Sequence, residues 1–164
     1  MEFDPKQTFR NPIQIGLIVD DLDNVLAVLE ETFGIGPFRI VDFPPEGNED
    51  VVMKYKGEDA GFTAKFCFFD LGNIEFEVIQ PLTGDTIWRD FLDTHGPGIH
   101  HIKFSVPEHG PSRAYLESKG FEIEQMGSSV GKNAGKEWVF YNTSDAIGFS
   151  IETMNEIVKS TQGS

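Results

Sequence analysis

Four residues whose side chains can bind a metal ion occupy matching positions in two similar halves of the chain. Gln14 in the first half matches His101 in the second, and Glu77 matches Glu152. An amide oxygen, an imidazole and two carboxylates suit a divalent metal ion that keeps open positions for water. Such an ion stabilises an enolate or enediolate, and a carboxylate beside it can remove and return the α-proton of a substrate.

Alternation along the predicted strands places these four side chains on one face. Successive side chains of a strand point to opposite faces of a sheet, so the apolar residues share the face under a helix and the polar residues share the other. Lys103 lies on the same face as His101, and His100 lies on the opposite one. Burying two carboxylates without a cation is costly, which favours a metal site. The alternative interpretation is that each polar residue is solvated on an exposed sheet face.

A weak internal repeat predicts the elements that position these residues. Each copy has a β-rich run, a helical segment that a glycine ends, and further strands. The sequence therefore predicts an α+β fold made of two βαβββ modules, residues 11–82 and 99–156, within a single domain of residues 11–156. A helix over residues 84–95 joins the modules, and residues 1–10 and 157–164 are expected to be flexible ends. A long irregular hairpin is expected around residues 46–61, and a glycine-rich loop over residues 127–135.

Charge and cysteine content exclude several classes of function. The 164 residues include 13 Lys and Arg against 27 Asp and Glu, a net charge of −14. This balance argues against nucleic acid or an anionic membrane surface as a partner. The single cysteine, Cys67, cannot form an intrachain disulfide, and its apolar surroundings predict an inert thiol. With no signal peptide and no membrane-spanning run expected, the sequence favours a cytoplasmic protein.

Four stretches of the chain resemble the vicinal oxygen chelate superfamily, also called the glyoxalase and bleomycin-resistance fold. The similarity is closest to methylmalonyl-CoA epimerase-like and glyoxalase I-like proteins. The stretch His95–Ile102, with its Gly-x-Gly-x-His-His-Ile pattern, is the most specific, and the other three are Ile13–Asp23, Leu71–Pro81 and Gly148–Glu152. The resemblance implies cupped mixed β-sheets around one divalent metal ion per site (Zn, Ni, Co or Mn), a small-molecule substrate and a homodimer.

The resemblance also implies roles for individual residues. The metal ligands of the family fall on Gln14, Glu77, His101 and Glu152, and the catalytic residues on Glu152 and Glu77. His100 is then a hydrogen-bonded structural residue rather than a ligand. The second catalytic glutamate of epimerases has no secure match, and the candidates are Glu46, Glu49 and Glu75. Lys132 and Lys136 flank a loop that closes over the substrate in this family, and Lys103 is expected to pair with the carboxylates.

Four functions remain open at this point. The first is a metal-dependent isomerase or epimerase, and the second is a lactoylglutathione lyase of the glyoxalase I type, which Gln14 and Glu77 favour. A ring-cleaving dioxygenase needs two histidines and one carboxylate, and Gln14 replaces one of the histidines. A metal-free module that only binds a ligand has no need of four metal ligands.

Overall fold

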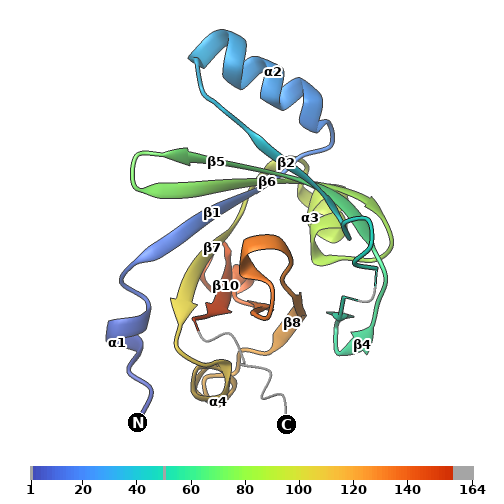
Figure 1. Ribbon diagram of the computed structural model, residues 1–164. Coiled ribbons are helices and arrows are strands. Elements are labelled where there is room, and N and C mark those ends of the chain that lie inside the picture. Colours follow the sequence, from blue (N-terminus) through green and yellow to red (C-terminus); the bar gives the residue numbers. More distant parts are fainter. Residues whose placement is uncertain (1, 50, 157–164) are drawn as a thin grey trace, which may run out of the picture.

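The computed structural model describes residues 2–49 and 51–156, in which ten strands form one strongly curved mixed sheet (Figure 1). The strand order is β2-β5-β6-β1-β7-β10-β9-β8-β3-β4. In chain order the strands are β1 (Pro12–Ile18), β2 (Arg39–Phe43), β3 (Met53–Tyr55), β4 (Glu58–Asp59), β5 (Thr63–Leu71), β6 (Ile74–Thr83), β7 (Gly98–Val106), β8 (Ile123–Ser128), β9 (Glu137–Tyr141) and β10 (Ser150–Asn155). The sheet curls into a half-barrel, which confirms the expected α+β fold of the vicinal oxygen chelate type.

The first strands of the two copies, β1 and β7, lie next to each other at the centre of the sheet, where its two halves meet. β1 pairs antiparallel with β7, and each has a parallel neighbour on its other side, β6 for β1 and β10 for β7. The remaining described pairs are antiparallel. The first strands of the two copies therefore lie side by side, and the last strands flank them. This arrangement brings polar residues from both copies to the floor of the concave face.

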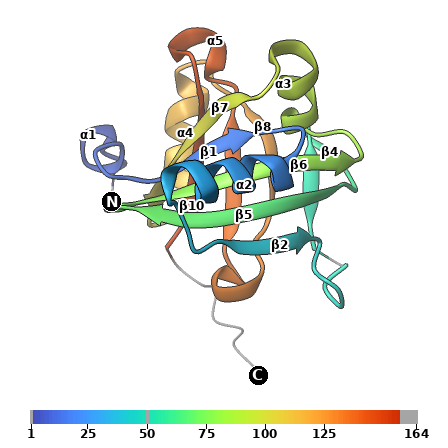
Figure 2. The ribbon, with the colours of Figure 1, turned by 90° about the horizontal axis from the view of Figure 1, so that it is seen from above.

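Helix α2 (Leu22–Phe33) covers the outer face of the first half, as Figure 2 shows from above. The Asp21 side chain accepts a hydrogen bond from the Asn24 N–H at its start, and Gly34 in the left-handed conformation (φ 65°) ends it. Leu22 and Leu26 pack against apolar side chains of β5 and β6, among them Cys67. Burial raises the pKa of the Cys67 thiol to about 11, which agrees with the expected inert cysteine.

Helix α4 (His109–Ser118) covers the outer face of the second half, where Leu116 packs against Val139 and Tyr141. The short helix α1 (Pro5–Thr8) lies beside it, flanked by two phenylalanines. The Phe9 ring meets Phe104 edge-on, with 5.3 Å between ring centroids, and the Phe3 ring packs against a tyrosine of α4. Residues 2–10 thus form a packed segment where a flexible end was expected, and residues 157–164 lie outside the described residues.

The segment between β2 and β5 corrects one expectation. Strand β3 was expected to belong to the first module, but it pairs with β8 of the second, with Lys54 opposite Met126. The hairpin of β3 and β4 thereby forms one end of the sheet, while β2, which precedes it in the chain, forms the other. Alternation within a short strand gives no information about which partner it joins, so this pairing is decided by the tertiary structure.

Helix α3 (Ile87–His95) joins the halves, as expected, and packs against β1, β6 and β7. The Thr86 side chain accepts a hydrogen bond from the Arg89 N–H, and the Ile87 N–H donates to Gln125 Oε1 on β8, 2.9 Å away. These contacts fix the start of the helix, and Trp88 packs into the core of the concave face. The remaining helices are η1 (Gly131–Asn133) and α5 (Ser144–Ile147). Within the described residues, no helix combines the length and apolar character needed to cross a bilayer.

Candidate metal centre and cavity

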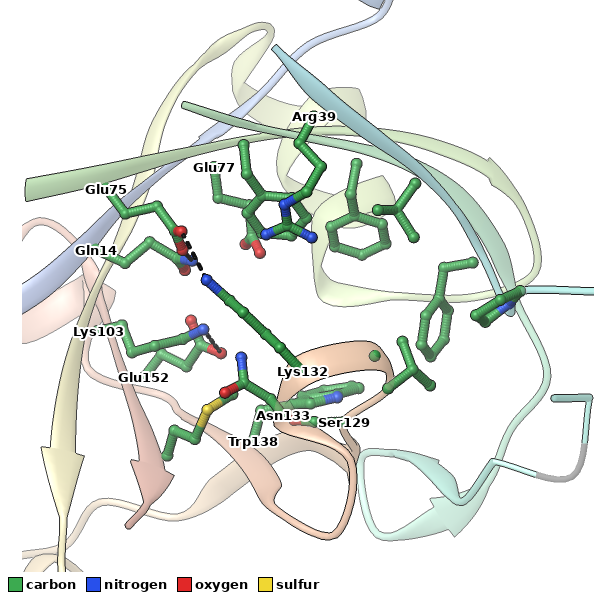
Figure 3. Close-up of a pocket in the computed structure, with 18 of the residues that line it drawn as sticks. Gln14, Arg39, Glu75, Glu77, Lys103, Ser129, Lys132, Asn133, Trp138 and Glu152 are labelled. Carbon is green, nitrogen blue, oxygen red and sulfur yellow. Dashed lines mark hydrogen bonds and ion pairs between the residues drawn. The ribbon is translucent and has the colours of Figure 1, made fainter. Parts of the chain in front are cut away.

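Two rows of residues cross the four central strands on the concave face. Register aligns Glu75, Gln14, Lys103 and Glu152 in one row, on β6, β1, β7 and β10. The second row, two residues along each strand, contains Glu77, Gly16, His101 and Ser150. The four predicted ligands and Lys103 therefore lie in two adjacent rows. Figure 3 shows five residues of these rows around the cavity: Glu75, Gln14, Lys103, Glu152 and Glu77.

His101 lies between two carboxylates that come from strands on opposite sides of the central pair. Its Nε2 atom is 3.2 Å from Glu77 Oε1 and 3.2 Å from Glu152 Oε2. One ligand atom from each of these residues lies within 4.8 Å of the other two, and all three side chains are buried. Ligand atoms held at 2.0–2.2 Å from one ion at right angles stand about 3 Å apart. We call Glu77, His101 and Glu152 the triad, and its spacing fits one divalent ion.

Gly16 makes room for the His101 ring. A Cβ atom at position 16 would lie 1.9 Å from Cε1 of His101 and 2.1 Å from its Nε2. The imidazole therefore occupies the space above the glycine backbone, in the row position directly opposite on β1. No other residue type leaves this space open, so the glycine is required by the placement of His101.

Three buried atoms at this site make no well-aligned hydrogen bond within the described part of the chain, although protonated His101 forms ion pairs with both carboxylates at 3.2 Å. They are Gln14 Oε1, His101 Nε2 and Glu152 Oε2. In each residue a second polar atom is already occupied: Gln14 Nε2 donates to Glu75 Oε1 at 2.8 Å, and Glu152 Oε1 lies 3.4 Å from Lys103 Nζ. His101 Nδ1 lies 2.9 Å from His100 Nδ1. Buried polar atoms with incomplete hydrogen bonding are costly, and these three have the chemistry of metal ligands.

His100 sits at a bulge in β7. Gly16 pairs with His101 and the next residue of β1 pairs with Ile99, so His100 is the extra residue on its strand. It is buried against Phe91 of α3, with 5.0 Å between ring centroids. Burial, and then the neighbouring His101, lowers the pKa of His100 to about 2. Neutral His100 can therefore accept a hydrogen bond from Nδ1–H of His101, which leaves Nε2 of His101 as the free nitrogen.

Charges at the centre compensate one another without a metal ion. Burial by itself would lower the pKa of His101, but the Glu152 and Glu77 carboxylates outweigh it and raise that pKa. Burial opposes ionisation of Glu152, yet Lys103 and His101 lower its pKa. When His101 gives up its proton, the carboxylates of Glu75, Glu77 and Glu152 outnumber the ammonium groups of Lys103 and Lys132 by one negative charge. This surplus of negative charge favours a bound cation.

A cavity of about 350 Å³ opens above the two rows. Gln14, Glu75, Glu77, Lys103 and Glu152 line its polar side, and Lys132 of the glycine-rich loop reaches Glu75 with Nζ 3.7 Å from Oε2. Of the candidates for the second glutamate, Glu75 lines the cavity. Glu46 and Glu49 lie on an exposed loop and are not part of the described lining, and neither is Lys136.

Several lining residues were not singled out from the sequence. Arg39 lies at the edge strand β2, with its guanidinium carbon 4.4 Å from the centre of the Phe68 ring. Alternation in β2 and β5 could have placed these residues on the concave face, but nothing in their types marked them as site residues. Trp88 and Trp138 also line the cavity.

Comparison with known proteins identifies one family, one relative by sequence and several solved structures with a similar fold. Residues 13–140 match the Glyoxalase/Bleomycin resistance protein/Dioxygenase superfamily. An uncharacterized protein of Bacillus subtilis (strain 168), YqjC, is 46% identical over 86 residues. That match spans 52% of this chain and 61% of the length of the relative.

Solved structures with the same fold include both uncharacterised proteins and enzymes. A hypothetical protein from Bacillus halodurans C-125 matches with a TM-score of 0.62 at 19% identity, covering 90% of this chain and 94% of the other. A methylmalonyl-CoA epimerase variant from Streptomyces coelicolor, in complex with 2-nitronate-propionyl-CoA, matches with a TM-score of 0.59 at 19% identity, covering 88% and 95%. The epimerase from Mycobacterium tuberculosis matches with a TM-score of 0.54 at 19% identity, covering 88% and 86%.

Proposed function

The chain belongs to the glyoxalase/bleomycin resistance protein/dioxygenase superfamily, and we propose that it is a metal-dependent isomerase or epimerase. In this proposal the protein removes a proton α to a carbonyl and returns it to the substrate. The observation that carries the proposal is the buried triad of Glu77, His101 and Glu152, whose ligand atoms lie within 4.8 Å of one another, with the free Oε1 of Gln14 in the neighbouring row. The likeness of the fold to methylmalonyl-CoA epimerases supports this class of reaction.

Gln14, Glu77, His101 and Glu152 would hold one divalent ion, with Zn, Ni, Co and Mn all compatible with this ligand set. The ion would supply Lewis-acid stabilisation of a developing oxyanion. Each proposed ligand except Glu77 has a partner that orients it: Glu75 for Gln14, His100 for His101 and Lys103 for Glu152. Such partners fix which atom faces the metal, since they occupy the other one.

Glu152 is the proposed base. Lys103 holds its Oε1 atom, so Oε2 faces the cavity floor next to His101. Glu77 reaches the same point from the opposite side, because β6 and β10 flank the central strand pair. Carboxylates on opposite faces of a carbon allow one to remove the proton and the other to return a proton, which gives epimerisation. A single carboxylate that carries the proton between neighbouring carbons gives isomerisation of the glyoxalase type.

Solvent exchange of substrate protons tests the proposed reaction. The protein loaded with Zn, Ni, Co or Mn is incubated in deuterated water with methylmalonyl thioesters, hemithioacetals and 2-hydroxy ketones. We expect deuterium to enter the α-position of one class, and only when metal is present, because a bound ion would stabilise the negative charge that develops on the substrate oxygen. Mass spectrometry or NMR measures the label, and metal-stripped protein is the control. Exchange that persists without metal, or turnover that requires dioxygen, would contradict the proposal.

Replacing Gly16 with alanine is expected to weaken metal binding by about 100-fold, the upper end of what disturbing a ligand's surroundings costs. The new methyl group would overlap the His101 ring, so the ring must leave its position between the carboxylates. Isothermal titration calorimetry with Zn²⁺ measures the loss. Gly110→Ala in α4 is the matched control, since a Cβ there meets nothing within 4 Å. Equal affinities of the two variants would show that Gly16 does not position the ligand.

Other expectations remain predictions about this chain. A homodimer fits the unpaired edge of β2, where Ile40 is 54% exposed. A cytoplasmic location stays a prediction from the sequence. A lyase of the glyoxalase I type uses the same four ligands, and the exchange experiment separates it from an epimerase by the substrate class that takes up deuterium.

A further inference from the structure

Six aromatic residues line the cavity, and we call them the aromatic wall: Phe43, Phe66, Phe68, Trp88, Trp138 and Phe140. The wall starts at the triad, because the Phe140 ring stands edge-on to His101 with 4.8 Å between ring centroids. From Phe140 it continues to Trp88, 5.9 Å away, and to Trp138, 5.8 Å away. Figure 3 shows Gln14, Glu75, Lys103 and Glu152 on one side of the cavity and apolar side chains on the other, with Arg39 and Lys132 between them.

Contacts behind the wall hold it in shape before any ligand binds. Trp138 donates a hydrogen bond from Nε1 to the Ser128 carbonyl at 3.2 Å. Its indole also fits against Gly127, where a Cβ would lie 2.4 Å from the ring. Trp88 is fixed edge-on between Phe62 and Phe66, with centroid distances of 5.3 Å and 5.5 Å. A preformed surface of rings selects ligands by shape, because it loses little conformational freedom on binding.

The size and chemistry of the cavity indicate what fills it. A cavity of about 150 Å³ lined by apolar side chains is large enough to bind benzene. The cavity here is about 350 Å³, which leaves room for a ring together with oxygen-bearing groups at the polar side. Water gains few hydrogen bonds along a wall of rings, and a methyl group would fill little of it. An apolar, planar group is the occupant that this surface fits best.

We propose that the substrate is an aryl-substituted acid with oxygens on neighbouring carbons. This inference rests on the proposed function. The ring of the substrate lies along the aromatic wall, and its two oxygens face the triad. The α-carbon then lies between ring and oxygens, next to the Glu152 carboxylate. Substrates of the 2-hydroxy-acid or 2-oxo-acid class with an aryl group have this shape. A methylmalonyl group, which offers only a methyl, would leave the wall uncovered.

Mandelate and lactate test this proposal, because they share the 2-hydroxy acid and differ only in phenyl against methyl. Both tryptophans of the chain line the cavity, so tryptophan fluorescence reports binding directly. With zinc-loaded protein, we expect mandelate to bind about 10-fold to 100-fold more tightly than lactate, from the apolar area that the ring buries. Equal affinities, or no binding of either acid, would overturn the proposal.

Two neighbouring phenylalanines provide a matched pair of variants. Phe68 lines the cavity, whereas Phe69 on the same strand faces α2 and packs against Phe38 and Phe76. We expect Phe68→Leu to lower mandelate affinity several-fold and to leave lactate affinity unchanged. Phe69→Leu should change neither. A Phe68→Leu variant that keeps the full preference for mandelate would count against the aromatic wall.

Zinc content separates the failure of this inference from failure of the proposed function. If the protein binds zinc but does not prefer mandelate, the inference is wrong and the metal proposal stands. If the protein binds none of Zn, Ni, Co and Mn, the proposed function is wrong. The same two titrations on metal-free protein then decide the aryl preference: a remaining preference for mandelate supports it, and none overturns it.

Discussion

Glu152→Gln is expected to lower the rate of α-proton exchange by about 10²-fold to 10⁴-fold, the usual contribution of a positioned general base. The amide keeps an oxygen of similar size but cannot accept a proton at neutral pH. Metal content should fall far less than the rate, because the oxygen can still face the ion. Deuterium uptake and metal content by mass spectrometry, measured on the same preparation, give the two numbers.

The interpretation of Glu152→Gln depends on two companion variants. Glu156→Gln is the control, because Glu156 follows the same strand and is exposed beside Ser105. We expect it to exchange at the wild-type rate. Glu77→Gln tests the carboxylate on the opposite side. Full exchange in Glu152→Gln together with loss in Glu77→Gln would transfer the role of base to Glu77.

His101→Ala is expected to abolish metal binding at micromolar protein. The imidazole is the central group of the triad, and its Nε2 atom lies 3.2 Å from each carboxylate. Without the imidazole, Glu77 and Glu152 remain buried beside the ammonium group of Lys103. Because Lys103 already supplies a positive charge, the two carboxylates alone bind a metal ion poorly. Calorimetric titration with Zn²⁺ measures the loss, and circular dichroism checks that the variant is folded.

The neighbouring His100→Ala should behave differently. His100 only accepts a hydrogen bond from the ligand, so we expect metal affinity to fall by about 10-fold to 100-fold rather than to vanish. The buried ring also packs on Phe91, so stability should fall as well. Equal metal loss in the two variants would contradict the assignment of His101 as the ligand.

Local sequence signals predicted the elements and the faces of their side chains. Asp21 caps the start of α2 and Gly34 ends it, and both residue types are helix-end signals that a short stretch of sequence carries. Alternation of period two placed Glu77 and Glu152 on the concave face, where both line the cavity. These properties depend on a residue and its immediate neighbours, so they can be read from a short stretch of sequence.

The register and the pairing partners of the strands are known only from the tertiary structure. The contact of Gly16 with His101 exists because β1 and β7 pair in one register, with His100 as a bulge between them. The hydrogen bond of His100 to His101 and the pairing of β3 with β8 have the same origin.

The sequence by itself therefore determined the α+β fold, the helix and strand boundaries near α2, and the face on which the polar residues lie. The tertiary structure decided which of these residues touch, which atoms are left free, and that six aromatic residues and Arg39 border the same cavity. The physical reason is the sequence separation over which each property is decided. Side-chain direction repeats every two residues along a strand, whereas contacts between strands depend on pairings across tens of residues, and a shift of one position changes all of them.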